Sequence, residues 1–185
     1  MSQLTKLALE QSLKNLLRKK SLAHITVTDI TEDCGISRMT FYYHFKDVYD
    51  LVEWACREDA SRALEGKKHY DNWQEGFLQI FEAVRENKIF ILNVYHCVSR
   101  EQIENYLFSL TFDLLKGVVD EEAKGMTVRE EDKIFIANTY KYAFVGVMLD
   151  WIKRDMLQDP KEIIEALDKV VRGGFRSALE RFRVG

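Results

Sequence analysis

Hydrophobic residues in the first third of the chain recur at the spacing of α-helices, and short polar segments separate these stretches. The pattern predicts four helices, over about residues 3–20, 27–34, 38–44 and 47–65. Thr26 begins a capping-box sequence, Gly35 stands where a helix can end in the left-handed conformation, and Ser37 is a good N-cap. Two short helices joined by a turn with a glycine predict a helix-turn-helix, whose second helix enters the major groove of DNA.

The remainder of the chain is also helical in pattern. The apolar spacing lapses over 66–72, which predicts a linker, and five further helices follow, over about 73–86, 88–98, 100–124, 128–156 and from 160 onward. Thr127 and Glu130 have the spacing of a second capping box, and Pro160 suits the first turn of the last helix. Because no alternation typical of strands occurs, the sequence predicts an all-α protein of about nine helices.

Composition and charge narrow the class of protein further. The longest uncharged run, 89–99, has eleven residues, well below the roughly 20 that a membrane helix needs. The chain starts without the apolar stretch of a signal peptide, so a cytoplasmic protein is expected. Net charge is −3, yet residues 1–46 hold seven lysines and arginines against four acids, which leaves 20 against 26 for the rest. This asymmetry favours an N-terminal segment that binds anions.

Sequence signatures of catalysis and metal binding do not occur. The four histidines are scattered and the three cysteines lack CxxC spacing, so neither a metal site nor a cofactor is expected. There is no P-loop, GxSxG or HExxH pattern, and no strand precedes the glycine pair at 173–174. The sequence therefore predicts that the protein is not an enzyme and has no catalytic residues.

Residues 26–51 resemble the DNA-binding signature of TetR-type transcriptional regulators. The resemblance is carried by Thr-Val-Thr-Asp-Ile at 26–30, Cys-Gly-Ile-Ser at 34–37 and Thr-Phe-Tyr-Tyr-His-Phe at 40–45. Within that family, residues 41–51 and the segment around Phe-Val-Gly at 144–146 are similar to the subgroup typified by regulators of dihydroxyacetone kinase operons. The family usually has a lysine where this chain has Val48, and Lys46, two residues earlier, is the candidate to replace it.

The resemblance implies roles for the residues of the helix-turn-helix. It implies contacts to phosphates from Thr40, Tyr42 and His44, and contacts to bases from Arg38, Met39 and Tyr43. Phosphate contacts position the protein, whereas arginine bound to guanine is the commonest specific base contact. Thr28 and Ser37, at the starts of the two short helices, fit a phosphate contact and a purely local role equally well.

Two further sites are predicted in the second part of the chain. The resemblance implies an effector pocket among the middle helices, with candidates Phe77, Phe81, Tyr95, His96, Tyr140 and Trp151, although aromatic residues at this spacing also fit a plain core. An apolar stripe on the last helices, together with a flat spot of small residues, predicts a dimer interface or intramolecular packing. Its members are Ala143, Gly146, Val147, Leu167, Val171, Phe175 and Leu179.

These observations predict a DNA-binding module in residues 1–50, a connecting helix over 47–65, and a dimerisation and ligand- or partner-binding domain in 66–185. The expected protein is a sequence-specific transcriptional regulator that binds a palindromic double-stranded DNA operator as a homodimer. A small effector or a co-regulator protein would control it, and no membrane is involved. The alternative is an all-helical interaction adaptor that does not bind DNA, which Val48 and the acidic total favour.

Overall fold

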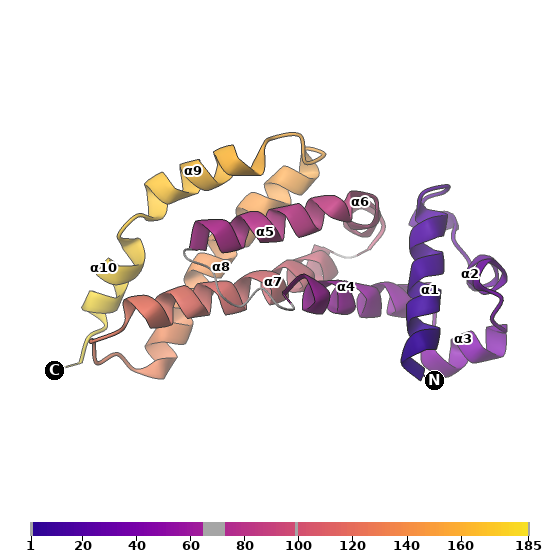
Figure 1. The fold of residues 1–185 in the computed structure, drawn as a ribbon, viewed down its shortest axis with the longest axis horizontal. Helices are drawn as coiled ribbons and strands as arrows, with labels where there is room; N and C mark the ends of the chain where they lie inside the picture. The colour runs from indigo at the N-terminus through magenta and orange to yellow at the C-terminus, as the bar shows by residue number, and fades with distance from the viewer. Residues whose placement is uncertain (1, 65–72, 99, 185) are drawn as a thin grey trace. The chain divides into compact units, whose positions relative to one another are not determined.

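The computed structural model describes residues 2–64, 73–98 and 100–184, which form ten α-helices, one 3-10 turn and no strand (Figure 1). The predicted all-α class is therefore confirmed. The first helices are α1 (Ser2–Leu17), the 3-10 turn η1 (Leu22–His24), α2 (Val27–Cys34), α3 (Arg38–His44) and α4 (Val48–Leu64). The later helices are α5 (Trp73–Glu86), α6 (Lys88–Cys97), α7 (Arg100–Glu122), α8 (Glu130–Lys153), α9 (Pro160–Val171) and α10 (Gly174–Arg181).

The structure divides the last predicted helix into α9 and α10. Gly173 separates them with a φ of +72°, a left-handed conformation that glycine adopts without the steric cost of a Cβ. Gly174 begins α10, and a Cβ there would lie 2.5 Å from the hydroxyl oxygen of Tyr140 on α8. The two glycines therefore have separate functions, since one permits the bend and the other permits a close approach of α8 and α10.

The capping box predicted at Thr127 is wrong. Helix α8 begins at Glu130, and its N-cap residue, Arg129, makes no side-chain capping bond. The carboxylate of Glu130 instead contacts two lysine ammonium groups, Lys116 at 2.8 Å and Lys133 at 2.6 Å. The carbonyl of Thr127 accepts a hydrogen bond from the backbone N–H of Val184. The Glu130 carboxylate, which a capping box would have used, is thus paired with lysines on α7 and α8 instead.

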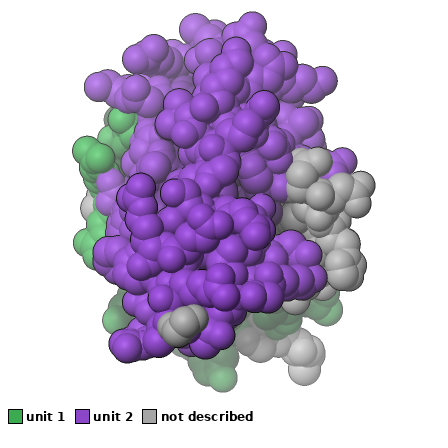
Figure 2. Space-filling view, turned by 90° about the vertical axis from the view of Figure 1, so that its left-hand side faces the viewer, with its two compact units in different colours: residues 1–59, 87–103 green, residues 60–86, 104–185 purple. Residues whose placement is uncertain are grey.

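The chain forms two compact units (Figure 2). Unit 1 comprises residues 1–59 and 87–103, and unit 2 comprises residues 60–86 and 104–185. This grouping places α6 with the N-terminal helices, although the sequence pattern assigned it to the second domain. The reason is a pair of contacts: the backbone N–H of Leu22 donates to the Asn93 side chain at 3.0 Å, and the ring of Phe90 lies 5.4 Å from the Lys14 ammonium.

Each unit has its own hydrophobic core. The centre of unit 1 consists of completely buried side chains from the first four helices: Leu9, Leu13, Ile30, Phe41 and Leu51. Unit 2 has an aromatic cluster in which Phe77 lies 4.9 Å from Phe81 and 4.6 Å from Phe144, measured between ring centres.

None of the helices in the described ranges has the length and apolar character needed to span a bilayer.

Candidate nucleic-acid interface

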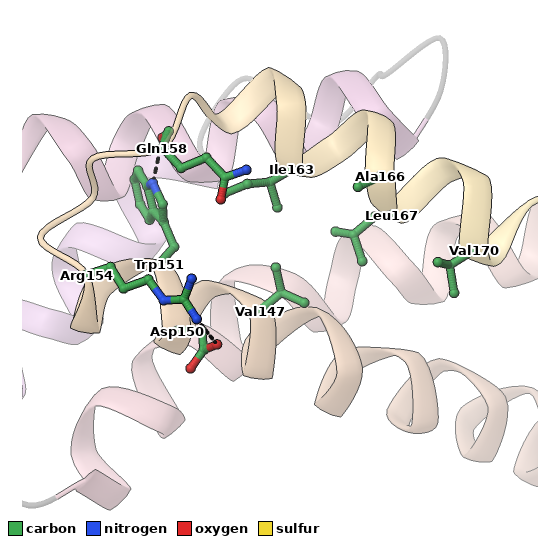
Figure 3. A pocket seen from close by; sticks show the side chains of 9 residues that line it. All are labelled: Val147, Asp150, Trp151, Arg154, Gln158, Ile163, Ala166, Leu167 and Val170. Atoms are coloured by element: carbon green, nitrogen blue, oxygen red, sulfur yellow. Dashed lines mark hydrogen bonds and ion pairs between the residues drawn. The ribbon is translucent and has the colours of Figure 1, made fainter.

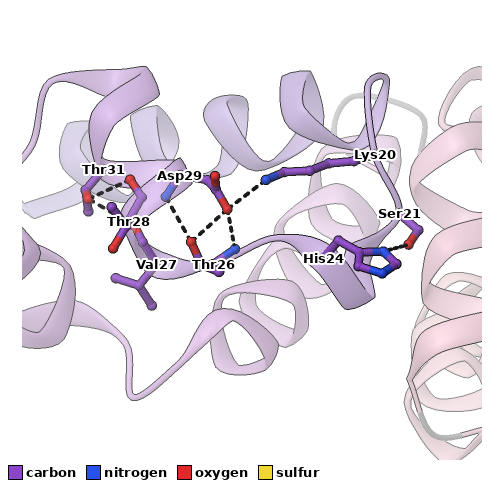
Figure 4. Close-up of polar contacts among 8 residues, drawn as sticks. All are labelled: Lys20, Ser21, His24, Thr26, Val27, Thr28, Asp29 and Thr31. Atoms are coloured by element: carbon purple, nitrogen blue, oxygen red, sulfur yellow. Dashed lines mark hydrogen bonds and ion pairs between the residues drawn. The ribbon is translucent and has the colours of Figure 1, made fainter.

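Helix α2 begins with the capping box that the sequence predicts (Figure 4). The backbone N–H of Asp29 donates to the Thr26 hydroxyl at 3.2 Å, and the backbone N–H of Thr26 donates to the Asp29 carboxylate at 2.7 Å. Lys20 adds an ion pair at 2.8 Å to the same carboxylate. The hydrogen bond from Lys20, followed by those from Thr26, lowers the pKa of Asp29 from 3.8 to about 2. The start of α2 is therefore defined by short-range polar contacts.

The turn between α2 and α3 depends on one glycine. Gly35 has a φ of +67°, and its backbone N–H and that of Ile36 both donate to the carbonyl of Thr31. On the opposite side, the hydroxyl of Ser12 on α1 donates to the carbonyl of Ile30 at 3.0 Å in a buried position. This contact attaches the helix-turn-helix to α1 through the backbone of α2.

The side chain of Ser37 caps α3, as predicted. Its hydroxyl oxygen accepts a hydrogen bond from the backbone N–H of Thr40 at 3.1 Å and shares another with the Thr40 hydroxyl at 2.8 Å. Phe41 is completely buried and Phe45, at the C-terminal end, is 3% exposed. These two rings fix the inner face of α3, so the remaining side chains of this seven-residue helix are directed away from the core.

The outer face of α3 carries the residues that the sequence assigned to DNA. Met39 is 84% exposed and Tyr43 is 82% exposed, values that no packing requirement of unit 1 explains. Tyr42 is 50% exposed with its ring edge-on to Phe41. Arg38, together with Lys46 beyond the helix, is exposed, whereas Thr40 and His44 are half-buried. The predicted base-facing residues are thus the most exposed part of the helix.

The remaining predicted contacts have different surroundings. Thr28 is half-buried in the first turn of α2, where its carbonyl accepts from the Thr31 hydroxyl. Val48 is 8% exposed, so it belongs to the core of unit 1. Asp47 accepts from the backbone N–H of Asp50, and Asp50 accepts from the backbone N–H of Lys46. The first turn of α4 therefore carries two carboxylates, and the only cation of this segment is Lys46.

The predicted effector-pocket residues have different surroundings. Phe77 and Phe81 are completely buried and Trp151 is 3% exposed, and their rings contact one another or Phe144 in the core of unit 2. Tyr140 is half-buried against Phe175, and burial raises the pKa of its hydroxyl. The other two candidates, Tyr95 and His96, lie on α6 in unit 1.

A groove of about 290 Å³ lies between α8 and α9 (Figure 3). The indole N–H of Trp151 at its edge donates to the carbonyl of Gln158 at 2.9 Å, and Arg154 pairs with Asp150 at 3.5 Å. Among its lining residues, Trp151 was predicted for an effector pocket and Val147 and Leu167 for the dimer interface, and Ile163 and Val170 lie on the same predicted apolar stripe. The lining residues that the sequence did not indicate are Asp150, Arg154, Gln158 and Ala166. Within the described ranges, no group of three metal-binding side chains is close enough to hold an ion.

The structure corrects part of the predicted dimer interface. Val171, Phe175 and Leu179 are 7%, 5% and 0% exposed within a single chain, because they pack against the core of unit 2. A charge at Val171 or Phe175 would therefore disrupt that core. Ala143 and Gly146 on α8 are exposed, Val147 and Leu167 are half-buried, and the neighbouring Val170 is 82% exposed. The apolar stripe therefore has a side that is buried within the chain and a side, with Val170, that is exposed.

The chain is all-helical, and the buried rings of Phe41 and Phe45 hold α3 so that its polar and aromatic face is exposed. This arrangement is that of a helix-turn-helix protein. Residues 71–173 match the TetR_C_8 family model, which describes a transcriptional regulator C-terminal region. The match covers more than half of the chain, and the chain belongs to the TetR family of transcriptional regulators. This is a family of regulators and not of enzymes.

Individual relatives agree with this assignment. The chain is 25% identical to the HTH-type dhaKLM operon transcriptional activator DhaS of Lactococcus lactis subsp. lactis (strain IL1403), over 65% of this chain and 64% of that protein. It is 27% identical to the uncharacterised HTH-type transcriptional regulator YerO of Bacillus subtilis (strain 168), over 89% of this chain and 63% of YerO. The matched part thus spans just under two thirds of either relative. A solved structure of the dihydroxyacetone kinase operon activator DhaS has the same fold, with a TM-score of 0.70 at 20% identity over 97% of this chain and 98% of that one.

Proposed function

We propose that this protein regulates transcription by binding a specific DNA operator as a homodimer, with α3 in the major groove. The observation that carries the proposal is the pair of exposed side chains Met39 and Tyr43, at 84% and 82%, on a helix held from behind by Phe41. Exposed apolar and aromatic side chains on a short, firmly anchored helix suit contacts with base edges. As a DNA-binding regulator, the protein would act in the cytoplasm.

The proposed contacts divide into two kinds. Arg38, Met39 and Tyr43 face the bases, and their loss changes which sequences bind. Contacts to the phosphates come from hydroxyls, the imidazole and an ammonium, namely those of Thr28, Ser37, Thr40, Tyr42, His44 and Lys46. Lys46 is an exposed cation next to the acidic start of α4, so it provides the electrostatic contact that the family's usual lysine would make at the position of Val48.

Sequence-selective binding tests the proposal directly. Sites are selected from random DNA with the full chain, and the affinity for the best site and for unrelated DNA is measured at several salt concentrations. A regulator prefers the selected site by about 10³-fold or more, and its affinity falls steeply as salt rises. An interaction adaptor enriches no sequence, and that result would refute the proposal. Transcription from the selected site then shows whether binding activates or represses.

The homodimer uses the outer face of α8 and α9. A single helix-turn-helix reads a short half-site, so a palindromic operator requires two copies related by a twofold axis. Ala143 and Gly146 are small and exposed, which permits a second helix to approach closely, and Val147 and Val170 border the groove between the two helices. Val170 is 82% exposed on α9, and Ala166 on the same helix is exposed as well, which favours coverage of this apolar edge by another chain.

The interface is tested with a charge at its exposed edge. Val170→Glu leaves the core of unit 2 intact because the side chain is already outside, and we expect a monomer in sedimentation equilibrium that retains its helical content. Thr127→Glu introduces the same charge at another exposed position of unit 2 and is the control, which stays dimeric. A wild-type protein that is monomeric at micromolar concentration contradicts the homodimer.

The last part of the proposal concerns regulation: a small effector or a co-regulator protein acts on unit 2 and controls operator binding. Tyr140 supports it, since this polar side chain is half-buried against the ring of Phe175. Operator affinity measured with and without each candidate, using wild type and Tyr140→Phe, tests the role of that hydroxyl. An effector that acts equally on both proteins excludes Tyr140 from its site.

A further inference from the structure

A buried ion triad in unit 1 has no role in the DNA contacts described above. Lys14 on α1 lies 2.8 Å from the Glu10 carboxylate on the same helix, and it donates to both carboxylate oxygens of Asp59 on α4, each at 2.8 Å. Glu10 is 3% exposed and Asp59 is 7% exposed. The ammonium of Lys14 also lies 5.4 Å from the ring centre of Phe90 on α6. One cation therefore contacts three helices of the unit.

The burial of these charges indicates a purpose other than stability. Removing charges from water is costly, and a buried ion group is often matched or exceeded in stability by apolar side chains of similar volume. The position of this ammonium is nevertheless restricted, because it contacts both oxygens of Asp59 and the carboxylate of Glu10, each at 2.8 Å. Sliding of α1 along α4 would lengthen the contacts with Asp59 and leave buried charge poorly paired, whereas a leucine or methionine contact loses little when it shifts.

The position of the triad relates it to the recognition helix. Asp59 is the last residue of unit 1 on α4, a helix that continues to Leu64. Lys14 lies on α1, and α1 holds α2 through the buried bond from Ser12 to the carbonyl of Ile30. A displacement of α4 at Asp59 therefore reaches α2 and then α3 by way of α1.

We propose that Glu10, Lys14 and Asp59 form a positioning latch that holds α1 in register with α4 and thereby sets the orientation of the recognition helix. The latch contributes geometry rather than stability. It rests on the proposed DNA-binding function and deepens it, because it adds residues that act on operator binding without touching DNA.

The test separates geometry from stability with three full-length variants. The apolar triad Glu10→Met, Lys14→Met, Asp59→Leu should keep or raise Tm, yet bind the selected operator about tenfold more weakly. Asp59→Asn removes one of the two buried carboxylates that contact Lys14, breaks the ion group without replacing it by apolar packing, and should lower Tm by about 10 °C. The control is Glu53→Met with Arg57→Leu, which removes an exposed ion pair on α4 and should alter neither quantity. The control leaves the net charge unchanged, whereas the apolar triad raises it by one, a change that by itself favours DNA binding and so opposes the expected loss.

Each outcome decides between the two roles. If the apolar variant binds the operator like wild type, the latch is refuted. If the apolar variant is unfolded, or has a lower Tm than Asp59→Asn, the charges serve stability and the latch is refuted as well. Amide hydrogen exchange without DNA gives an independent readout: the latch predicts faster exchange in α1 and in residues 48–59 of the apolar variant at unchanged Tm. If the wild type binds no DNA, the proposed function fails, while unchanged exchange would refute the latch alone.

Discussion

Two groups of aromatic residues that were predicted for binding sites, one in each unit, have opposite surroundings. In unit 1, α3 has two adjacent tyrosines, of which Tyr43 is 82% exposed, although the helix has only seven residues. In unit 2, the rings of Phe77, Phe81 and Trp151 are at most 3% exposed and contact one another or Phe144. The sequence assigned both groups to binding sites. Their exposure distinguishes the two groups. Packing explains a ring that fills a core, whereas it does not explain a ring that is exposed to solvent.

Helices α2 and α3 of unit 1 also begin differently from α8 of unit 2. Helices α2 and α3 are too short to be stable alone, and both have side-chain caps, from Thr26 and Ser37. The long helix α8 has no side-chain cap, and its first turn is held by the ion pairs of Glu130 with Lys116 and Lys133. Local bonds thus stabilise the ends of the short helices of unit 1, whereas contacts between helices hold the start of α8.

The largest expected effect separates a core ring from an exposed one. Phe81→Ala should lower the free energy of unfolding by about 3–5 kcal/mol, because it removes a completely buried ring from the cluster of unit 2. Tyr43→Ala should change it by less than about 0.5 kcal/mol, because that ring is outside. Urea unfolding measures both. A small cost at Phe81 would mean that the ring borders an open pocket after all.

The next effect concerns DNA specificity. Arg38→Ala should weaken binding by about 1–3 kcal/mol and relax selectivity at one base position. Tyr42→Phe should weaken all sequences by a similar factor, because a phosphate contact carries no base information. Both are measured against a panel of operators with single base changes, with Lys153→Ala in unit 2 as the control. Identical sequence profiles for Arg38→Ala and wild type would show that α3 does not read the bases with this residue.

Glycine substitutions compare the turn of unit 1 with a helix of unit 2. Gly35→Ala should destabilise the protein by about 1–2 kcal/mol, because alanine is strained at a φ of +67°. Gly117→Ala should stabilise it by about 0.5–1 kcal/mol, because Gly117 is exposed inside α7 and a Cβ there meets nothing within 4 Å. Thermal unfolding measures both changes. Equal effects of the two substitutions would contradict the left-handed turn.

The smallest effect is a pH dependence at the start of α2. The pKa of Asp29 is lowered from 3.8 to about 2 in the folded protein, so its stabilising contribution is complete above pH 4 and is lost as pH falls toward 2. The difference in Tm between wild type and Asp29→Asn should therefore be present at pH 6 and vanish near pH 2. Asp33→Asn, at an exposed position of the same helix, is the control. A difference that persists at pH 2 would mean that the carboxylate charge is not its source.

Local signals in the sequence were enough for the helix-turn-helix. The Thr26 box, the left-handed Gly35, the Ser37 cap and the proline that opens α9 all appear in the structure where the pattern placed them. Each of these signals acts over four or five residues, through a side chain that satisfies a neighbouring backbone group or through a backbone that only glycine tolerates. Such signals need no distant partner, although a tertiary contact can override them: the same pattern at Thr127 failed, and Glu130 pairs with Lys116 of α7 instead.

Contacts between distant residues were decided by the tertiary structure alone. An apolar stripe in the sequence indicates that its side chains are buried, but not which element covers them. Packing within one chain covers Val171 and Phe175 and leaves Val170 exposed. The same applies to charges: Lys14 and Asp59 are 45 residues apart and read as ordinary surface residues until α1 and α4 come together. Periodicity along one helix determines which face is apolar, whereas the neighbour that covers it depends on the free energy of the whole packed arrangement.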